Sequence, residues 1–556
     1  MTVQICLGAY PAKRCARATH YMFSPKPPPR TEPDADALAL REQGVLFEEE
    51  ITGILAGVPG TVVLDSEDGW AKTVKATVDA MRRRVPVIVG GRLPNTDTRK
   101  GAPDVLVMTV DGYVPVDIKS HGTRNDSPRK SLMVSSFGTP AQRHSVKGLS
   151  DSWDRWYDDG LQLAHYTRML QELGFHAGDG HLIGGVIGRS EFSEFGGCPW
   201  LIVWLDLDSP CKDTYSASSE THRAKRSLLE RYDHEFGFRL KVAEAARRGE
   251  ELVRTFHISE CSGCEWRDYC AENAPENDAS FAIGIELPSA QQWRQIYDTG
   301  VKSIADLAAL DPDSQPENWG KRTTRTGRGE GGGDAWAKLI RRARLVEDGR
   351  HFEPLDGDWP EVPSADVEID FDLEWDDTGI YLWGLRVRQG QDGSTADYKS
   401  HSVYSFDPNV DDTELAAEVA KRLRAIIAEA DANGQTVKVF HWSHPERTRT
   451  ERFPDLVEVL HPLLYDLGVW FKENFLSARG WSIKYVAPLF DFHWAVESAG
   501  GLNSMEKIKI ARGEGPEAEA ARDWLLRYNE CDVAAQAAIR DGIRARIAKE
   551  RDQKQQ

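Results

Sequence analysis

The chain lacks the features that mark membrane-bound and secreted proteins. Its 556 residues contain no apolar run that approaches the roughly 18 residues needed to cross a bilayer. The apolar stretch from Ile5 to Tyr10 is short and is followed by Pro11 and Lys13, unlike the apolar core of a signal peptide. Hydrophobic and charged contents of 40% and 28% predict an ordinary soluble protein, which we expect in the cytoplasm without a membrane partner.

Cysteine and positive charge are also in short supply. Eight cysteines in a cytoplasmic chain of this length do not predict a disulfide framework. The net charge of −19 argues against nucleic-acid binding by bulk electrostatic attraction. A nuclease stays open, because acidic sites bind metal ions and local basic segments can contact phosphates. Residues 124–147 predict either such a phosphate-contacting loop or a solvated insertion.

The length allows two or three domains. Residues 1–280 and residues 356–556 each alternate strand-like and helix-like segments and predict two α/β domains. Between them, residues 281–355 predict a helical domain, in which a helix, a turn at Gly300 and a second helix resemble a helix-hairpin-helix element. The expected fold class is therefore α/β with a helical middle.

A β-hairpin over residues 104–119 carries the first set of chemically informative residues. Its turn signal is Asp111-Gly112, and a two-residue loop there would place Asp104 opposite Lys119. Asp117 shares a face with Lys119, because side chains alternate along a strand. Two carboxylates and one lysine on one face suit metal-assisted phosphodiester hydrolysis. Taken alone, the same residues predict a solvated strand face with a cross-strand ion pair more readily than a catalytic site.

The three cysteines Cys261, Cys264 and Cys270 form a C-x2-C-x5-C cluster, and Cys15 lies far upstream. Thiolates at this spacing bind Zn²⁺ or an iron–sulfur cluster. A helix is expected over residues 153–173, where Gln162 and Tyr166 are four residues apart and share a face.

The second α/β domain has carboxylates of its own. Asp372 and Glu374 alternate along a predicted strand and point to one face. Glu446 follows a second predicted strand, and Tyr528 and Asp532 share a face of a predicted helix. Four acids from separate elements, with a tyrosine to orient water, fit a two-metal nuclease. The alternative is a set of surface acids on an acidic protein.

Together these residues resemble a RecB-like nuclease of the PD-(D/E)xK superfamily with an iron–sulfur cluster. The first half is similar to CRISPR-associated iron–sulfur nucleases and to the nuclease module of bacterial helicase–nucleases. The chain more closely resembles bacterial RecB-like nucleases that append a ribonuclease H-like exonuclease domain, over nearly its full length. The resemblance implies a restriction-endonuclease-like core, a 4Fe-4S cluster and a DEDD-type C-terminal domain.

The resemblance assigns roles to individual residues. It implies that Cys15, Cys261, Cys264 and Cys270 hold the cluster. It places the core acid on Asp104, the Asp-x-Lys pair on Asp117 and Lys119, and the Gln-x3-Tyr motif on Gln162 and Tyr166. In the second domain it implies the catalytic set Asp372, Glu374, Glu446, Tyr528 and Asp532, with Mg²⁺ or Mn²⁺ bound at both centres.

Two positions depart from the pattern. Many relatives have a metal-binding histidine where Phe47 stands, so either Glu48 replaces it as a ligand or the metal site is weakened. Glu446 stands where aspartate is usual. We expect a nuclease acting on single-stranded DNA or free ends, with RNA as an alternative substrate. The competing hypotheses are a catalytically degenerate nucleic-acid-binding scaffold and a structural zinc protein with an unrelated hydrolase core.

Overall fold

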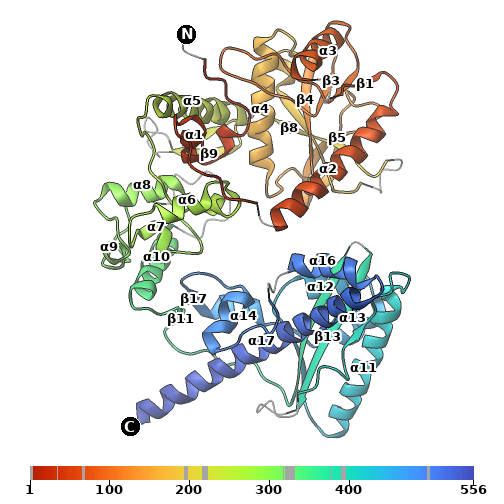
Figure 1. Ribbon diagram of the computed structural model, residues 1–556, viewed down its shortest axis with the longest axis vertical. Coiled ribbons are helices and arrows are strands. Elements are labelled where there is room, and N and C mark those ends of the chain that lie inside the picture. Colours follow the sequence, from red (N-terminus) through yellow and green to blue (C-terminus); the bar gives the residue numbers. More distant parts are fainter. Residues whose placement is uncertain are drawn as a thin grey trace. The chain divides into compact units, whose positions relative to one another are not determined.

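The chain forms two compact units in a computed structural model (Figure 1). The structure describes residues 4–33, 35–65, 69–192, 198–215, 223–316, 319, 332–376, 378–389, 396–497 and 501–555. Unit 1 comprises residues 1–281, 287–301 and 315–336, and unit 2 comprises residues 282–286, 302–314 and 337–556. The expected middle domain, residues 281–355, does not form a compact unit of its own but divides between these two. None of the described helices combines the length and apolar character that crossing a bilayer requires.

Unit 1 is built on an eight-stranded mixed sheet. In sheet order its strands are β1 (Thr61–Val63), β2 (Val87–Val89), β3 (Val105–Met108), β4 (Tyr113–Lys119), β7 (Ile183–Gly188), β8 (Ile202–Asp206), β5 (Asn125–Ser135) and β6 (His144–Ser150). The neighbours β1–β2 and β4–β7 are parallel, and the other neighbours are antiparallel. A separate two-stranded sheet pairs β9 (Lys212–Tyr215) with β10 (Arg223–Arg226).

The described helices of unit 1 are α1 (Ala16–Phe23), α2 (Ala35–Ala56), α3 (Trp70–Arg82), α4 (Trp156–Glu172), α5 (Leu228–Arg247), α6 (Arg267–Glu272) and α8 (Ala290–Asp298), with α7 (Ala279–Ala282) at the unit's boundary. Helices α2 and α4 contact this sheet, and α1 packs on α5. Helix α4 is buried along most of its length against β4 and β7. Gly184 permits this approach, because a Cβ there would lie 2.6 Å from the Leu163 side chain.

The β3–β4 hairpin forms as expected, but its predicted register is wrong by two residues. Met108 pairs with Tyr113, so Asp104 does not lie opposite Lys119. The Thr109 backbone N–H and hydroxyl both donate to the Gly112 carbonyl, at 2.7 and 2.9 Å, which leaves Val110 and Asp111 as the loop. Position 112 must be glycine because the chain passes close to His176 there. A Cβ on residue 112 would lie 2.6 Å from the His176 carbonyl oxygen. A two-residue shift preserves the face of every side chain, so the acids remain on the expected side.

Residues 124–147 are neither a polar loop nor a solvated insertion over most of their length. They form β5 and the start of β6, which pair antiparallel with one irregularity between Asp126 and Ser131. Apolar residues such as Leu132 and Val134 are buried in the core of unit 1. The sequence pattern failed here because the solvent-facing residues of the hairpin are basic and polar.

Unit 2 is built on a five-stranded sheet. In sheet order its strands are β14 (Val403–Tyr404), β13 (Gly379–Gln389), β12 (Val367–Asp376), β15 (Val437–His441) and β16 (Leu464–Asp466). The neighbours β14–β13 and β13–β12 are antiparallel, whereas β12–β15 and β15–β16 are parallel. A second, two-stranded sheet pairs β11 (Phe352–Pro354) with β17 (Phe475–Ser477).

The described helices of unit 2 are α9 (Ile304–Ala308), most of α10 (Gly332–Glu347), α11 (Asp412–Ala432), α12 (Pro445–Thr450), α13 (Pro454–Leu460), α14 (Leu467–Asn474), α15 (Ile483–Val486), α16 (Gly501–Ala511) and α17 (Pro516–Gln555). Helix α11 packs on one face of the larger sheet and α17 packs on the other. Helices α8 and α9 are the two expected around the middle turn, where Gly300 has a φ of 99°.

Strand β12 separates an apolar face from an acidic one. Its odd-numbered residues, including Ile369 and Phe371, pack in one core cluster with residues of α11 and α13. Its even-numbered residues face the long helix α17, which lies across the sheet in Figure 1. This alternation follows from the two-residue period of a strand. It brings Glu368, Asp370 and Asp372 into hydrogen-bonding contact with side chains of α17.

Buried ion pairs fix the position of α17 along β12. The Arg540 guanidinium donates to Asp370 and Glu368, and all three side chains are fully buried. One turn earlier on the helix, the Gln536 amide donates to the Phe371 carbonyl at 3.0 Å. The contacts recur at helical spacing, so they determine which helix residues lie opposite the C-terminal end of β12.

Candidate functional site

Unit 1 brings Asp104, Asp117 and Lys119 together on the sheet. The Asp104 carboxylate accepts a hydrogen bond of 2.7 Å from the Ile118 backbone N–H, across the hairpin. The Lys119 ammonium lies 3.1 Å from Asp117 Oδ2, and the Asp117 side chain is fully buried. Neither Asp117 carboxylate oxygen accepts a hydrogen bond. A buried carboxylate in this state has lone pairs available for another cation.

The charges of this first centre are strongly coupled. Burial, followed by the negative charge of Asp117, raises the pKa of Asp104 to about 7. Burial acts to lower the pKa of Lys119, but the carboxylates of Asp117 and Asp104 outweigh it and raise that pKa. Lys119 therefore stays an ammonium ion at neutral pH.

Gln162 and Tyr166 lie on one buried face of α4, as expected, and the Gln162 amide donates to the Tyr166 hydroxyl at 3.2 Å. Burial raises the pKa of Tyr166 well above its ordinary value, and the charges of Asp117 and Asp104 act in the same direction. Tyr166 is therefore close enough to both acids to brace the centre or to contact a bound ligand.

Sequence reasoning missed two further parts of this centre. The Lys13 ammonium donates to the Gln162 amide oxygen. Burial, followed by the positive charge of Lys119, lowers the pKa of Lys13 to about 8. His121 and Asp159 are hydrogen-bonded at 2.8 Å, just beyond Lys119 in the chain. The motif Asp-x-Lys-x-His was visible in the sequence, whereas Lys13 had no local signal.

Phe47 and Glu48 are in the expected helix, α2, but differ in environment. Phe47 is buried in the core of unit 1 and packs edge-to-face against Trp200, with 5.9 Å between ring centroids. Glu48 is exposed. The negative charge of Glu48 helps to raise the pKa of Asp104. Among the described residues, however, the ligand atoms of Glu48, Asp104 and Asp117 do not all lie within 4.8 Å of one another. The structure thus does not bring Glu48 into ligand position.

The four cysteines singled out from the sequence line one cavity of about 460 Å³ in unit 1. The loop before α6 supplies Cys261 and Cys264, α6 supplies Cys270, and Cys15 precedes α1. Burial raises the pKa of Cys261 to about 11, and the charges of the other three thiolates add to this effect. Four thiols from two distant segments therefore share one site.

The segments that carry these cysteines are tied together by hydrogen bonds. The Thr31 backbone N–H donates to the Glu265 carbonyl at 2.6 Å, and the Asp268 backbone N–H donates to the Thr31 hydroxyl at 3.1 Å. No three of the four sulfur atoms lie within 4.8 Å of one another among the described residues.

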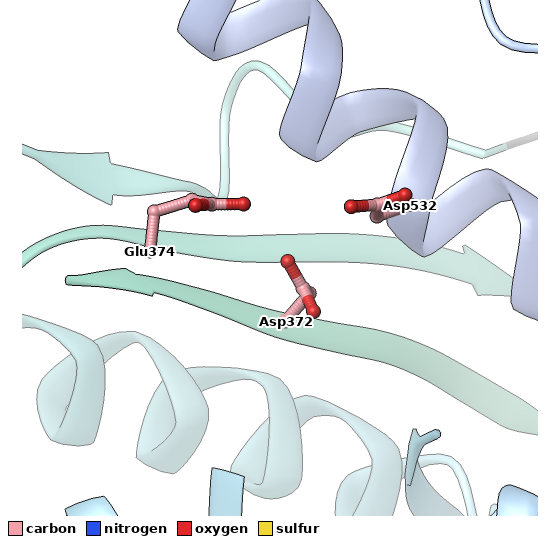
Figure 2. A group of neighbouring side chains, drawn as sticks. All are labelled: Asp372, Glu374 and Asp532. Carbon is pink, nitrogen blue, oxygen red and sulfur yellow. The ribbon is translucent and has the colours of Figure 1, made fainter. Parts of the chain in front are cut away.

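Unit 2 gathers its acids at the C-terminal end of β12. Ligand atoms of Asp372, Glu374 and Asp532 all lie within 4.8 Å of one another. Figure 2 shows the two strand carboxylates and the carboxylate of Asp532, on α17, directed toward a common space. Among the described residues, this is the one such group of three histidine, cysteine or acidic side chains. Hard divalent cations such as Mg²⁺ and Mn²⁺ prefer oxygen ligands of this kind.

Asn529 orients the first of these acids and was missed from the sequence. Its side-chain N–H donates to Asp372 Oδ2 at 2.7 Å, and its oxygen accepts from the Tyr398 hydroxyl at 2.8 Å. Gly384, opposite Asp372 on β13, leaves the room, because a Cβ there would overlap the Asn529 amide. Asn529 and Asp532 are three residues apart on α17, so helical spacing could have indicated it.

Tyr528 and Glu446 border the group without joining it. Tyr528 is buried, and burial followed by the charge of Asp532 raises its pKa. Both Glu446 carboxylate oxygens accept from the Ser443 hydroxyl, at 3.0 and 2.9 Å. The charge of Glu446 acts on Asp372 and Glu374, so it lies close to them, but its carboxylate is held by Ser443.

Burial and mutual repulsion keep protons on the acids of unit 2. Burial, then the negative charge of Asp532, raises the pKa of Glu374 to about 8. The pKa of Asp372 moves in the same direction for the same two reasons. Three carboxylates this close cannot all be ionised unless a cation balances them.

These shifts lead to a pH-dependent stability. In the window between the ordinary carboxyl pKa and about 8, the folded site holds more protons than the unfolded chain. The unfolding free energy should therefore decrease as pH rises from about 5 to about 8. We expect the Tm of metal-free protein to decrease across this range, and less steeply in Glu374→Gln. Calorimetry in EDTA measures both slopes, and equal slopes would contradict the assignment.

Neither a protein-family model nor a curated protein or solved structure matches this chain. Inference about its function therefore depends on the two carboxylate centres and the cysteine cavity.

Proposed function

We propose that this chain is a metal-dependent nuclease that hydrolyses phosphodiester bonds in DNA. The observation that carries the proposal is the convergence of Asp372, Glu374 and Asp532 within 4.8 Å. Asp372 and Glu374 come from strand β12, and Asp532 comes from helix α17, far along the chain. Buried ion pairs fix the position of α17 on β12. A chance cluster of surface acids would not be buried beneath a helix in this way.

The surrounding side chains fit phosphodiester hydrolysis. A divalent cation bound by the three acids would supply positive charge at the phosphate and lower the pKa of a bound water. Tyr528 stays protonated because its pKa is raised, so its hydroxyl can donate to water or to a phosphate oxygen. The sheet order β14-β13-β12-β15-β16, with three antiparallel strands followed by two parallel ones, supports a ribonuclease H-like assignment.

The first centre supports the same reaction class. Asp117 has two buried oxygens that accept no hydrogen bond, and Asp104 lies close enough for the two charges to interact. Lys119 remains charged and would hold a phosphate oxygen or stabilise charge that develops during attack. We assign this centre to the restriction-endonuclease-like class, with single-stranded DNA or free ends as substrate and RNA as the alternative.

We further propose that the cysteine cavity holds a 4Fe-4S cluster. The donor set fits, because four thiols line one cavity and thiolates are the ligands of such clusters. Such a cluster would cross-link two distant segments and stabilise unit 1. Protein purified without oxygen should be brown and contain iron and sulfide. Stoichiometric zinc without iron would contradict the assignment, and Cys211→Ser, outside the cavity, is the matched control for Cys261→Ser.

The proposed function is tested with labelled single-stranded, double-stranded and circular DNA, and with RNA, in Mg²⁺ or Mn²⁺. Asp372→Asn combined with Glu374→Gln should abolish cleavage by unit 2 and spare the cleavage that depends on Lys119. The centres have separate ligands, so each loss should be independent. A folded parent that binds these nucleic acids but cleaves none would favour the scaffold hypothesis, for which buried Phe47 is the specific observation.

A further inference from the structure

A lysine occupies one side of the acidic group in unit 2. The Lys484 ammonium, on α15, donates a hydrogen bond to Asp532 Oδ1. The Trp494 indole N–H donates to the same oxygen at 2.6 Å. Neither residue was expected from the sequence to belong to this centre. Asp532 thus presents one oxygen to these donors, and its other oxygen accepts no hydrogen bond from either of them.

Two aromatic rings hold the ammonium in this position. Lys484 Nζ lies 4.1 Å from the centroid of Trp494 and 4.5 Å from the centroid of Tyr528. Tyr528 is itself stacked on Trp524, with 5.1 Å between centroids and 14° between planes. Cation–π contacts in a partly desolvated site hold an ammonium ion in place. The cation is therefore a fixed part of the centre.

One divalent cation together with this lysine balances the charges of the three acids that are gathered within 4.8 Å. Asp372, Glu374 and Asp532 carry three negative charges when ionised. One divalent cation and one ammonium ion neutralise them. Glu446, the fourth acid assigned from the sequence, is turned to the Ser443 hydroxyl and does not join the group. A second divalent cation would have to displace the Lys484 ammonium from Asp532 and draw Glu446 away from the Ser443 hydroxyl.

We propose that the unit 2 centre binds a single divalent cation and that Lys484 takes the place of the second one. The inference rests on the proposed nuclease function and specifies its metal content. The Lys484 side chain is 32% exposed, so its ammonium remains accessible from solvent while it contacts Asp532. In this position it binds a phosphate oxygen of the substrate, as the second cation of a two-metal site does.

The test counts Mn²⁺ by equilibrium dialysis in the full-length chain carrying Asp117→Asn, which silences the first centre. The count is the difference between this protein and the same protein with Asp372→Asn and Glu374→Gln. We expect a difference of one Mn²⁺. Lys484→Met should retain that ion and lower cleavage by about 10²-fold or more, a loss typical of removing one charge-stabilising group. Excess Mn²⁺ should restore part of the activity by filling the vacated position.

Lys472→Met is the matched control. Lys472 is exposed and lies over the Trp481 ring at 5.0 Å, so the substitution removes a cation–π lysine of the same unit away from the acids. Its metal count and cleavage should equal those of the parent. A difference of two Mn²⁺, or parental cleavage by Lys484→Met, would overturn the inference and leave the nuclease function standing. A difference of zero would instead contradict the metal site on which the proposed function depends.

Discussion

Replacing Arg540 by alanine should lower the unfolding free energy of the protein by about 3–5 kcal/mol, the range for removing one partner of a buried ion pair. The Arg540 side chain is fully buried between Asp370 and Glu368. Its loss would leave Asp370 with Arg386 at 3.3 Å, whereas Glu368 would keep Arg388 and Arg544. Urea-induced unfolding followed by tryptophan fluorescence measures the change.

Arg527→Ala on the same helix is the control. Arg527 forms a pair of 3.0 Å with Asp523 one turn away, and both side chains are 61% exposed. Such pairs contribute less than about 1 kcal/mol. Equal losses in the two variants would show that Arg540 does not fix α17 on β12. Arg540→Ala should also weaken Mn²⁺ binding, because Asp532 depends on that helix register.

The second large effect is expected at the first centre. Substitution of its acid should change metal binding, whereas substitution of its lysine should change the cleavage rate. Asp117→Asn should reduce Mn²⁺ affinity, because the amide offers one neutral oxygen in place of a carboxylate. Lys119→Ala should keep Mn²⁺ and lower cleavage by about 10²–10³-fold, as loss of one charge-stabilising group does. Calorimetric titration and a cleavage assay on the same preparations separate the two effects.

Lys75→Ala is the control for this pair, because Lys75 is 80% exposed on α3 of the same unit. The melting temperature of Lys119→Ala should be lower in EDTA than that of the parent, since the buried Asp117 loses its counter-ion. Added Mn²⁺ should recover much of that difference by supplying a new one. Parental cleavage in both active-site variants would remove the hairpin from the catalytic centre.

Local periodicity was enough to predict which side chains share a face. The two-residue period of a strand placed Asp372 beside Glu374, and the helical period placed Tyr528 beside Asp532. The hairpin register was wrong by two residues, because Gly112 is needed for close approach to residue 176 rather than for the turn. Asp104 still lies on the predicted face of the sheet, because the register shift was an even number of residues.

Contacts between distant segments could not be predicted in this way. Lys484 reaches Asp532 through an ion pair that spans 48 residues, and Lys13 reaches Gln162 across 149 residues. A lone lysine in a charged chain carries no signal of such a contact. The hairpin formed by β5 and β6 was missed for a related reason: burial of a few apolar residues outweighs the polar composition of its exposed face.

The central claim is that Asp372, Glu374 and Asp532 bind a divalent cation. Calorimetric titration of Mn²⁺ into the metal-free, full-length chain, beside the variant with Asp372→Asn and Glu374→Gln, tests it most directly. We expect the parent to bind one more Mn²⁺ than the variant and to release protons as it does so, because Glu374 holds a proton near neutral pH in the metal-free site. Identical titrations of the two proteins would contradict the claim.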